Sequence, residues 1–512
     1  MVPFSKLTCV LPPQARRKGM LHMLYIGIDL GTSALKAILM DGEGKILFSS
    51  SRSYPLEFPN PGWSQQNPED WEKAVNDCLK ELCANCDANE IAGISVAGQM
   101  HGLVVLDEND AVIRPAILWN DGRSTEETDY LNNVIGREKL SAWTGNIAFA
   151  GFTAPKLLWM RNNEPESFIK IRRIMLPKDY IVYRLTGTFS TDLSDASGFL
   201  LLDVKNRRWS EEMLEICGVS AAQMPKLFES YECVGEVKSE IAESLGLPRG
   251  VKVAAGAGDN AAAAIGTATV GDGSCNISLG TSGTIFISSD RFALDSANAL
   301  HSFAHADGSY HLMGCMLSAA SCNKWWAEEI LKSGDFAALQ NGIGDEALGH
   351  NNVLFLPYLM GERSPHNDPS ARGAFVGMSM DTTREDMTLA VLEGVAFALR
   401  DSLECAKALG IQISSSRLCG GGAKSELWQK IMANVLNIDI ELLCAEEGPG
   451  LGAAILAAVA CGEYPSVGEA AKSIVKTSKT IRPTPEIAAA YEKRYRLFRR
   501  LYPALKNAGE AV

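Results

Sequence analysis

The tetrapeptide Leu-Gly-Thr-Ser occurs twice in this chain, at Leu30–Ser33 and again at Leu279–Ser282. Apolar, strand-like runs flank both copies: Leu24–Ile28, Ala34–Met40, Cys275–Ser278 and Thr284–Ser288. The pattern predicts a strand, a turn and a second strand, once in each half of the chain. Glycine at such a turn permits a positive φ and lets a ligand approach the backbone closely. The repeat therefore indicates one architecture used twice.

The two turns are candidate phosphate-binding loops. Successive turn amides form a concave donor site that suits phosphate oxygens, and two facing turns could hold both ends of a triphosphate. The candidate ATP-binding residues are Gly31, Thr32, Ser33, Gly280, Thr281 and Ser282. Neither turn is a Walker A loop, because no Gly-Lys-[Ser/Thr] ends it. The alternative is two ordinary hairpins that share common turn residues.

A chain of 512 residues is too long for a single core. Strand and helix patterns alternate at first, helix patterns dominate from Pro115 to about Glu240, and a strand pattern restarts near Gly250. This order predicts an α/β fold. We expect a disordered extension over residues 1–22, a first domain over 23–250 and a second domain over 251–512, whose last helices can pack back on the first domain.

Composition excludes several classes of function. A net charge of −13 argues against nucleic acid as a partner. No run of 18 apolar residues is present, so we expect no membrane-spanning segment. Thirteen cysteines, mostly among apolar neighbours, suit a reducing cytoplasm better than a disulfide framework.

Three of these cysteines match the spacing of an iron–sulfur site. Cys78, Cys83 and Cys86 have the plant-type Cys-x4-Cys-x2-Cys pattern. The segment Glu69–Leu82, however, has the apolar period of an amphipathic helix. We therefore interpret these residues as core thiols.

Two aspartates stand beside predicted turns. Asp29 precedes the first turn and could hold Mg²⁺ against bound phosphates, or it could satisfy turn amides at the end of its strand. Asp259 lies between a strand and the alanine-rich run Ala261–Thr267. The dipole of a helix there would favour its ionised form. A simple N-cap is the alternative for Asp259.

Three further segments carry candidate binding groups. Val96–Gly102 places Gln99 and His101 at the end of a buried strand, where they could read hydroxyl groups, although a lone histidine is often structural. Trp119–Arg123 adds an acid and a base that could bind a sugar or pair with each other. Gly420–Gly422 offers a flat surface for adenine, or only a tight turn.

With these residues the chain resembles the FGGY family of carbohydrate kinases, relatives of actin and chaperone ATPases, from Leu24 to about Glu463. The first family signature fits Gly151–Met160, and the second fits Gly373–Met378 and continues to Glu393. The resemblance implies two actin-like (ribonuclease H-like) domains flanking a catalytic cleft. It implies that the first domain, residues 23–250, is sugar-binding and that the second, residues 251–512, is ATP-binding. It also implies a homodimer.

The resemblance assigns roles to individual positions. Asp259 is implied as the general base for a sugar hydroxyl, and Asp29 as a carboxylate on the metal side. The implied substrate-binding residues are Gln99, Met100, His101 and Asn260. The implied adenosine-binding residues are Gly421, Gly422 and Ala423.

The implied activity is ATP- and Mg²⁺-dependent phosphorylation of a sugar. Five segments resemble those of family members that phosphorylate D-xylulose at its 5-hydroxyl: Gln99–Gly102, Trp119–Arg123, Leu176–Tyr180, Gly258–Ala261 and Gly361–Asn367. Glycerol kinases have Arg-Glu in place of Met100-His101 and Gln in place of Asn260. Another ketose or polyol (ribulose, fuculose or an erythritol-like alcohol) is the alternative substrate. An actin-like ATPase that phosphorylates no small molecule is the alternative class.

Overall fold

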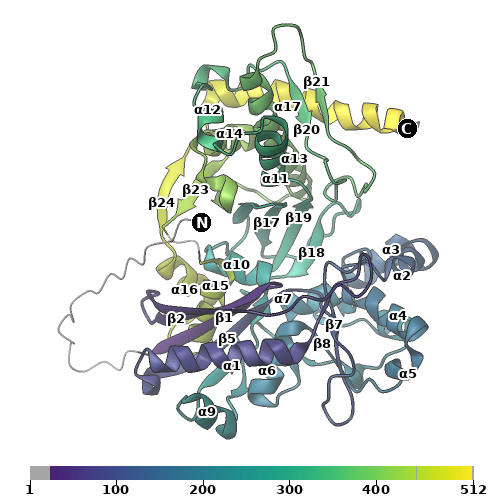
Figure 1. Cartoon of the computed structure of the whole chain (residues 1–512), viewed down its shortest axis with the longest axis vertical. Coiled ribbons are helices and arrows are strands. Elements are labelled where there is room, and N and C mark those ends of the chain that lie inside the picture. Colours follow the sequence, from purple (N-terminus) through teal and green to yellow (C-terminus); the bar gives the residue numbers. More distant parts are fainter. Residues whose placement is uncertain (1–22, 445–446, 510–512) are drawn as a thin grey trace, which may run out of the picture.

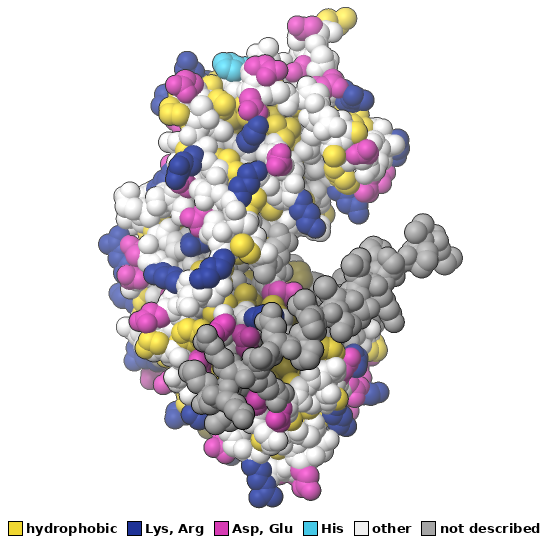
Figure 2. Space-filling model, turned by 90° about the vertical axis from the view of Figure 1, so that its left-hand side faces the viewer, with side chains coloured by type: hydrophobic (Ala, Val, Ile, Leu, Met, Phe, Trp, Pro, Cys, Tyr) yellow, Lys and Arg dark blue, Asp and Glu magenta, His cyan; other side chains and the backbone are white. Residues whose placement is uncertain are grey.

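The computed structural model describes residues 23–444 and 447–509. The predicted disordered extension, residues 1–22, lies outside the described residues. Two mixed sheets, each with helices around it, form two domains stacked along the long axis of the molecule (Figure 1). Acidic and basic side chains are mixed over the face that Figure 2 shows.

The first sheet comes from the first half of the chain. Its strands in spatial order are β13 (Cys233–Glu236), β14 (Lys252–Ala254), β5 (Ile91–Gly98), β1 (Leu24–Leu30), β2 (Ala34–Asp41) and β3 (Ile46–Ser53). β1, β2 and β3 are antiparallel neighbours, whereas β5 runs parallel to β1 and β14 runs parallel to β5. A short strand, β15 (Ala257–Gly258), pairs with the end of β5. The strands predicted around the first turn are therefore present.

The second sheet repeats this order. Its strands are β18 (His301–Ala304), β19 (Tyr310–Met316), β17 (Gly283–Ser289), β16 (Cys275–Leu279), β22 (Ser415–Cys419), β23 (Asp439–Leu443) and β24 (Thr477–Ile481). β16, β17 and β19 are antiparallel neighbours, and β22 and β23 continue in parallel from β16. The two Leu-Gly-Thr-Ser turns join β1 to β2 and β16 to β17. The duplication predicted from the repeat is thus confirmed.

Helix α1 (Pro68–Ala84) covers the outer face of the first sheet. The Asn67 side chain accepts a hydrogen bond from the Glu69 amide, and Pro68 occupies the first turn, so the helix begins where its capping residues stand. Trp71 and Cys78 face the core of the first domain. Cys78 is therefore a core thiol, as its helical spacing predicts. Cys78, Cys83 and Cys86, the three cysteines with iron–sulfur spacing, carry free thiols.

Small residues let α10 (Asp259–Gly266) and α15 (Gly448–Cys461) pack backbone to backbone between the two sheets (Figure 1). A Cβ atom at Gly452 would lie 1.8 Å from the Ala262 carbonyl oxygen. The other face of α15 lies on β1, where a Cβ at Gly27 would lie 2.1 Å from the Gly450 carbonyl oxygen. A helix from the second half of the sequence thus covers the sheet of the first half.

The strand pairing bears on the domain boundary that we expected at residue 250. β14 and β15 both lie after that residue, yet both pair with β5 of the first sheet. We therefore propose that the boundary lies after α10. Near the chain's end, α16 (Val467–Ile474) packs against α10 and α15, whereas α17 (Pro485–Gly509) packs against α13 (Arg384–Ala408) and α14 (Glu426–Leu436) of the second domain.

The region between β7 (Ala116–Ile117) and β13 is rich in helices, as the sequence predicts, and has a core of its own. Its helices are α2 (Thr125–Asp129), α3 (Arg137–Thr144), α4 (Thr153–Asn163), α5 (Pro165–Phe168), α6 (Pro177–Thr186), α7 (Leu193–Ala196) and α8 (Glu211–Cys217). We call this helix-rich region, residues 118–232, the cap. Ser197 and Asn146 of the cap bond to backbone groups of β18, so the cap also contacts the second sheet. None of the described helices combines the length and apolarity needed to cross a bilayer.

The contact between α10 and α15 makes a testable prediction. We expect Gly452→Ala to lower the free energy of unfolding by about 1–3 kcal/mol, because the added methyl group meets the Ala262 carbonyl. Gly468→Ala is the matched control, because a Cβ at this position of α16 meets nothing within 4 Å. It should raise stability by up to about 1 kcal/mol through helix propensity. Thermal unfolding of the two variants measures this difference. Equal melting temperatures for Gly452→Ala and Gly468→Ala would contradict the prediction.

Candidate active site

The first predicted phosphate turn, residues 31–33, lies at the end of β1. The Gly31 amide donates to the Ala34 carbonyl at 3.2 Å, and the Tyr54 hydroxyl donates to the Gly31 carbonyl. Neither Gly31 nor Gly280 has a positive φ, so our expectation that these glycines supply that conformation is wrong. A Cβ at Gly31 would lie 3.0 Å from the Ala34 carbonyl oxygen. The role of glycine here is therefore the absence of a side chain, which leaves the backbone of the turn accessible.

A network of amide and hydroxyl groups supports this turn from behind. The Thr32 hydroxyl donates to Gln99 Oε1 at 3.0 Å, and Gln99 Nε2 donates to Gln66 Oε1, also at 3.0 Å. Gln66 Nε2 closes the ring by donating to the Thr32 carbonyl at 2.7 Å. Gln99 is only 1% exposed. We therefore propose that Gln99 supports the turn instead of contacting substrate. Gln66 belongs to the same network, although no sequence motif indicated it.

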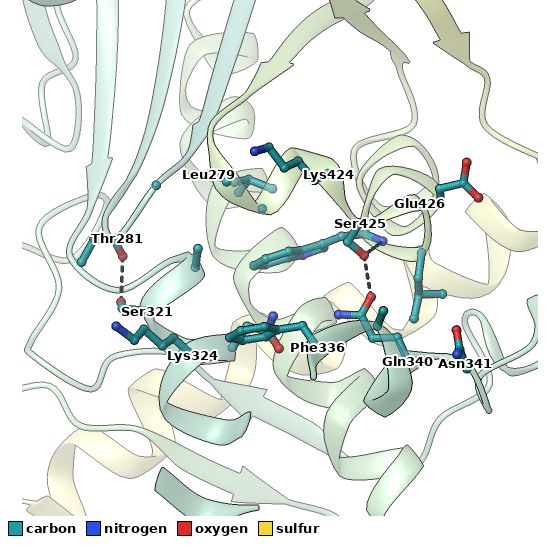
Figure 3. Close-up of a pocket in the computed structure, with 18 residues that line it drawn as sticks. Leu279, Thr281, Ser321, Lys324, Phe336, Gln340, Asn341, Lys424, Ser425 and Glu426 are labelled. Atoms are coloured by element: carbon teal, nitrogen blue, oxygen red, sulfur yellow. Dashed lines mark hydrogen bonds between the residues drawn. The ribbon is translucent and has the colours of Figure 1, made fainter. Parts of the chain in front are cut away.

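The second turn, residues 280–282, is held by the segment that follows β19. Ala320 N donates to the Gly280 carbonyl at 2.8 Å, and Ala319 N donates to the Thr281 carbonyl at 3.0 Å. The Ser321 hydroxyl also donates to the Thr281 carbonyl, at 2.7 Å (Figure 3). Gly420 approaches from β22 with a φ of 86°, and a Cβ there would lie 2.8 Å from the Leu279 carbonyl. Here the glycine conformation is required.

A cavity of about 910 Å³ opens beside the second turn (Figure 3). Four predicted nucleotide-binding residues line it: Gly280, Thr281, Gly421 and Gly422. Ala423, the remaining predicted adenosine residue, is buried behind them at 4% exposure and does not line the cavity. Sequence reasoning missed the opposite wall, which comes from α11 (Ala320–Lys324) and α12 (Phe336–Gln340) and presents the Phe336 ring to the cavity.

A smaller cavity, of about 310 Å³, lies between α10 and the second sheet. Asn260 and Thr267 line it from α10, and Ser278 and Gly420 line it from the sheet. It also reaches Pro449 in the first turn of α15. Its lining thus includes Asn260, the neighbour of Asp259, and Gly420, the neighbour of Gly421 in the larger cavity.

Asp29 and Asp259 form a pair of poorly solvated carboxyl groups. Burial raises the pKa of Asp29 to about 6, although the charge of Lys36, its neighbour on β2, acts in the opposite direction. Burial, followed by the charge of Asp29, raises the pKa of Asp259 to about 7, against the hydrogen bonds from Asn260. Asp259 is therefore close to half-protonated at neutral pH, which is the property of a general base.

The alternative interpretation of Asp259 as an N-cap is not what the structure shows. The N-cap of α10 is Gly258, which makes no side-chain cap bond, and Asp259 is the first helical residue. Its Oδ1 accepts from the Asn260 backbone amide at 2.7 Å and from Asn260 Nδ2 at 3.1 Å. Asn260 Nδ2 also lies 3.9 Å from Met100 Sδ. Asp259, Asn260 and Met100, all predicted site residues, thus lie together.

His101 has a left-handed backbone, with a φ of 70°, that turns its ring away from β5. Its Nδ1 lies 3.0 Å from the Gly198 carbonyl, so this nitrogen carries the proton and Nε2 is left as an acceptor. Burial lowers the pKa of His101 to about 3, with Lys156 and Arg363 acting in the same direction. His101 therefore stays neutral.

Lys156, from the first signature, fixes this backbone conformation. It is fully buried, and its Nζ donates to the His101 carbonyl at 2.8 Å and to the Gly151 carbonyl at 2.6 Å. Burial lowers the pKa of Lys156 well below its usual value. The sequence motif identified this lysine as part of a signature but gave no role for it.

The acid and base of Trp119–Arg123 pair with each other. Arg123 donates to Asp121 Oδ2 at 2.7 Å, and both side chains are buried. The guanidinium carbon of Arg123 lies 4.0 Å from the ring centre of Trp63. Of the two alternatives for this segment, pairing is the one that the structure shows.

The donor set suits Mg²⁺ bound together with phosphates. Residues 23–444 and 447–509 contain no group of three or more His, Cys, Asp or Glu side chains arranged to hold a metal ion by themselves. Mg²⁺ is usually bound by one or two carboxylates and by substrate phosphates. Asp29 is such a carboxylate, and a cation beside it would offset the unfavourable ionisation of the Asp29–Asp259 pair.

The two sheets have the same strand order, each carries a glycine turn, and a carboxyl pair lies between them. These features define a two-domain, nucleotide-dependent enzyme of the α/β class. Models of the FGGY family of carbohydrate kinases match residues 24–266 with the N-terminal domain and residues 275–461 with the C-terminal domain. The chain therefore belongs to the FGGY family of carbohydrate kinases.

Individual relatives agree with this assignment over almost their full length. The xylulose kinase of Escherichia coli (strain K12) is 41% identical over 484 residues, which cover 94% of this chain and 99% of the relative. A crystal structure of a xyloylose kinase from Brucella ovis has a TM-score of 0.90 at 40% identity, covering 95% of this chain and all of that one. A gluconate kinase from Lactobacillus acidophilus has a TM-score of 0.89 at 29% identity, covering 94% and 98%.

The raised pKa values predict how the carboxyl pair affects stability. Both folded-state pKa values lie above the value near 4 of an aspartate in an unfolded chain. The folded protein thus retains protons that the unfolded chain releases, and stability falls as pH rises from about 4 through 7. Asp259→Asn should therefore stabilise the protein more at pH 8 than at pH 5, with a difference on the order of 1–3 kcal/mol.

Thermal unfolding at the two pH values measures this difference. Asp129→Asn, which removes an exposed carboxylate at the end of α2, is the control and should have the same small effect at both. An Asp259→Asn variant whose stability gain does not depend on pH would contradict the prediction.

Proposed function

We propose that this protein transfers the γ-phosphoryl group of ATP to the 5-hydroxyl group of D-xylulose. The observation that carries the proposal is the position of Asp259 at the start of α10. Burial raises the pKa of this carboxyl to about 7, and its Oδ1 accepts a hydrogen bond from Asn260 Nδ2, which also contacts Met100 Sδ. Asn260 lines the small cavity that reaches Gly420, the neighbour of Gly421 in the larger cavity. The relative from Escherichia coli, a xylulose kinase, supports the choice of sugar.

Asp259 would accept the proton of the attacking hydroxyl group. Phosphoryl transfer passes through a loose transition state, so positioning and charge neutralisation supply most of the rate, and the base acts late. A carboxylate with an ordinary pKa would be a weak base for this step, whereas a pKa near 7 matches the working pH. Asn260, through its two hydrogen bonds to Asp259 Oδ1, fixes the orientation of the carboxylate.

The two turns and Asp29 would bind the phosphate end of ATP. Backbone amides of residues 32–33 and 280–282 would supply donors, and Thr32 is held by Gln99. Mg²⁺, held by Asp29 and the phosphates, would neutralise charge on the phosphate oxygens. Gly421, Gly422 and Phe336 line the cavity that would take adenosine.

The sugar side of the site offers neutral, preoriented groups. His101 presents Nε2 as an acceptor for a hydroxyl proton, because Nδ1 is bound to Gly198 and Lys156 holds the backbone. A Cβ at Gly258 would lie 2.9 Å from Met100 Cγ, and a Cβ at Gly198 would lie 2.4 Å from His101 Nδ1, so both glycines make room for these side chains. A neutral imidazole beside a thioether suits an uncharged polyol better than a carboxylate.

A second sugar is the alternative substrate. The gluconate kinase from Lactobacillus acidophilus shares the fold at 29% identity, so the fold does not by itself select the sugar. A coupled ADP-release assay over pentuloses, hexuloses, polyols and gluconate separates these candidates. The homodimer and the cytoplasmic location stay predictions.

The role of Asp259 predicts the effect of its removal. We expect Asp259→Asn to lower kcat with D-xylulose by about 10²–10⁴-fold, because the hydroxyl group then lacks a proton acceptor. ATP binding, measured by calorimetry, should stay within about threefold of wild type, since the adenosine cavity lies elsewhere. Turnover near the wild-type rate would refute the proposed role.

The role of Asp29 predicts a change in metal dependence. Asp29→Asn should raise the Mg²⁺ concentration needed for half-maximal activity by about 10–100-fold, because a ligand carboxylate is lost. Mg²⁺ titration at saturating ATP measures this. Asp129→Asn is again the control, and an Asp29 variant with the same Mg²⁺ requirement as this control would contradict the assignment.

A further inference from the structure

Arg363 extends from the second domain towards the sugar side of the site. It lies in the connection between β20 (Leu354–Leu356) and β21 (Ala374–Val376). Its guanidinium carbon is 4.3 Å from the ring centre of Phe149, a residue of the cap. Its charge acts with burial to lower the pKa of His101 and of His301. The Phe149 ring contacts Phe152 with ring centres 5.6 Å apart, and Phe152 contacts His101 with ring centres 4.6 Å apart. A chain of two aromatic rings thus connects this second-domain cation to His101.

This cation has no acidic partner among the described side chains. Other poorly exposed arginines are paired: Arg123 with Asp121 at 2.7 Å, and Arg494 with Glu393 at 2.6 Å. Within residues 23–444 and 447–509, no carboxylate lies within 4.0 Å of the Arg363 guanidinium group. A guanidinium group has five N–H donors, and the contact with the Cys315 thiol uses only part of them. The remaining donors are available to oxygen atoms of a ligand.

The backbone of Arg363 is fixed to the end of β19. Glu362 Oε1 accepts from the Arg363 amide at 2.7 Å and from the Leu317 amide at 3.2 Å. Ser364 exchanges two hydrogen bonds with Cys315, at 2.8 and 3.0 Å. The guanidinium group therefore extends from a well-anchored backbone.

The same short segment also holds the second phosphate turn. Ala319, two residues beyond Leu317, donates its amide to the Thr281 carbonyl at 3.0 Å. Arg363 and the second phosphate turn are therefore parts of one hydrogen-bonded unit of the second domain.

We propose that Arg363 binds an oxygen atom of the sugar, and that it is the second domain's contribution to the sugar site. This inference rests on the proposed function. The sugar groups named so far, Met100, His101 and Asn260, precede β16 and lie before the domain boundary that we propose after α10. A sugar held by them and by Arg363 joins the two domains, and so sets the distance between the hydroxyl group and the phosphate turn.

The test is a steady-state comparison of Arg363→Gln with wild type. We expect the KM for D-xylulose to rise about 10–100-fold, because hydrogen bonds from a charged donor are lost, while the KM for ATP changes by less than about threefold. D-xylulose binding without nucleotide, measured by calorimetry, should weaken to the same extent. Arg363→Lys, which keeps the charge but not the planar donor geometry, should be intermediate.

The matched control is Arg372→Gln. Arg372 lies on the same connection, is exposed, and donates only to the backbone carbonyls of Pro369 and Ala371. It should keep wild-type constants. A rise in the KM for ATP without one for D-xylulose would show that Arg363 binds phosphate and would overturn the proposal. Unchanged constants in both Arg363 variants would also overturn it.

The two proposals fail in distinguishable ways. Wild-type enzyme without activity on D-xylulose would refute the proposed function. The Arg363 variants would then be compared on the sugar that the substrate panel identifies, with the same expected rise in the KM for that sugar. Arg363→Lys and direct sugar binding keep the inference testable if Arg363→Gln does not fold.

Discussion

The close contact between α10 and α15 is the constraint on which the rest of the structure depends. Glycine and alanine at their crossing let the two backbones meet, and a Cβ at Gly452 has no room beside Ala262. This contact places Asp259, the first residue of α10, between the two sheets. It also places the first turn of α15 beside the cavity that reaches Asn260. The small glycine and alanine residues at this crossing therefore set the distance between the carboxyl pair and the two phosphate turns.

The same tight centre explains the chemistry of the carboxyl pair. Asp29 and Asp259 lie where two domains exclude water, so burial is the largest cause of both raised pKa values. The arrangement costs stability at neutral pH, as is common for groups tuned to accept a proton. The neutral His101 and the network behind Thr32 add polar groups without adding a second anion. Asp29 and Asp259 therefore supply acidic groups to the site, and the polar groups of His101 and of this network are neutral.

The sequence predicted the fold and the centre of the site, because both depend on local patterns. The repeated turn predicted the duplication, and Asp259, Asn260 and Met100 lie together as expected. The sequence does not show what folds behind a residue: Gln99 and Ala423, which it predicts as ligand-binding residues, are buried, and their ligand contacts stay predictions. Sequence reasoning missed Phe336 and the position of Arg363, because segments far apart in the chain bring them to the site.

The position of α15 on the first sheet has a consequence for synthesis of the protein. Tyr25, Ile38 and Met40 share an apolar cluster with α15, although more than four hundred residues separate them from it in the sequence. On the ribosome, that face of the first sheet is completed only after residues 448–461 have left the exit tunnel. Most of the chain must therefore be translated before its first sheet is covered, and a chaperone that shields this apolar face would act during that interval.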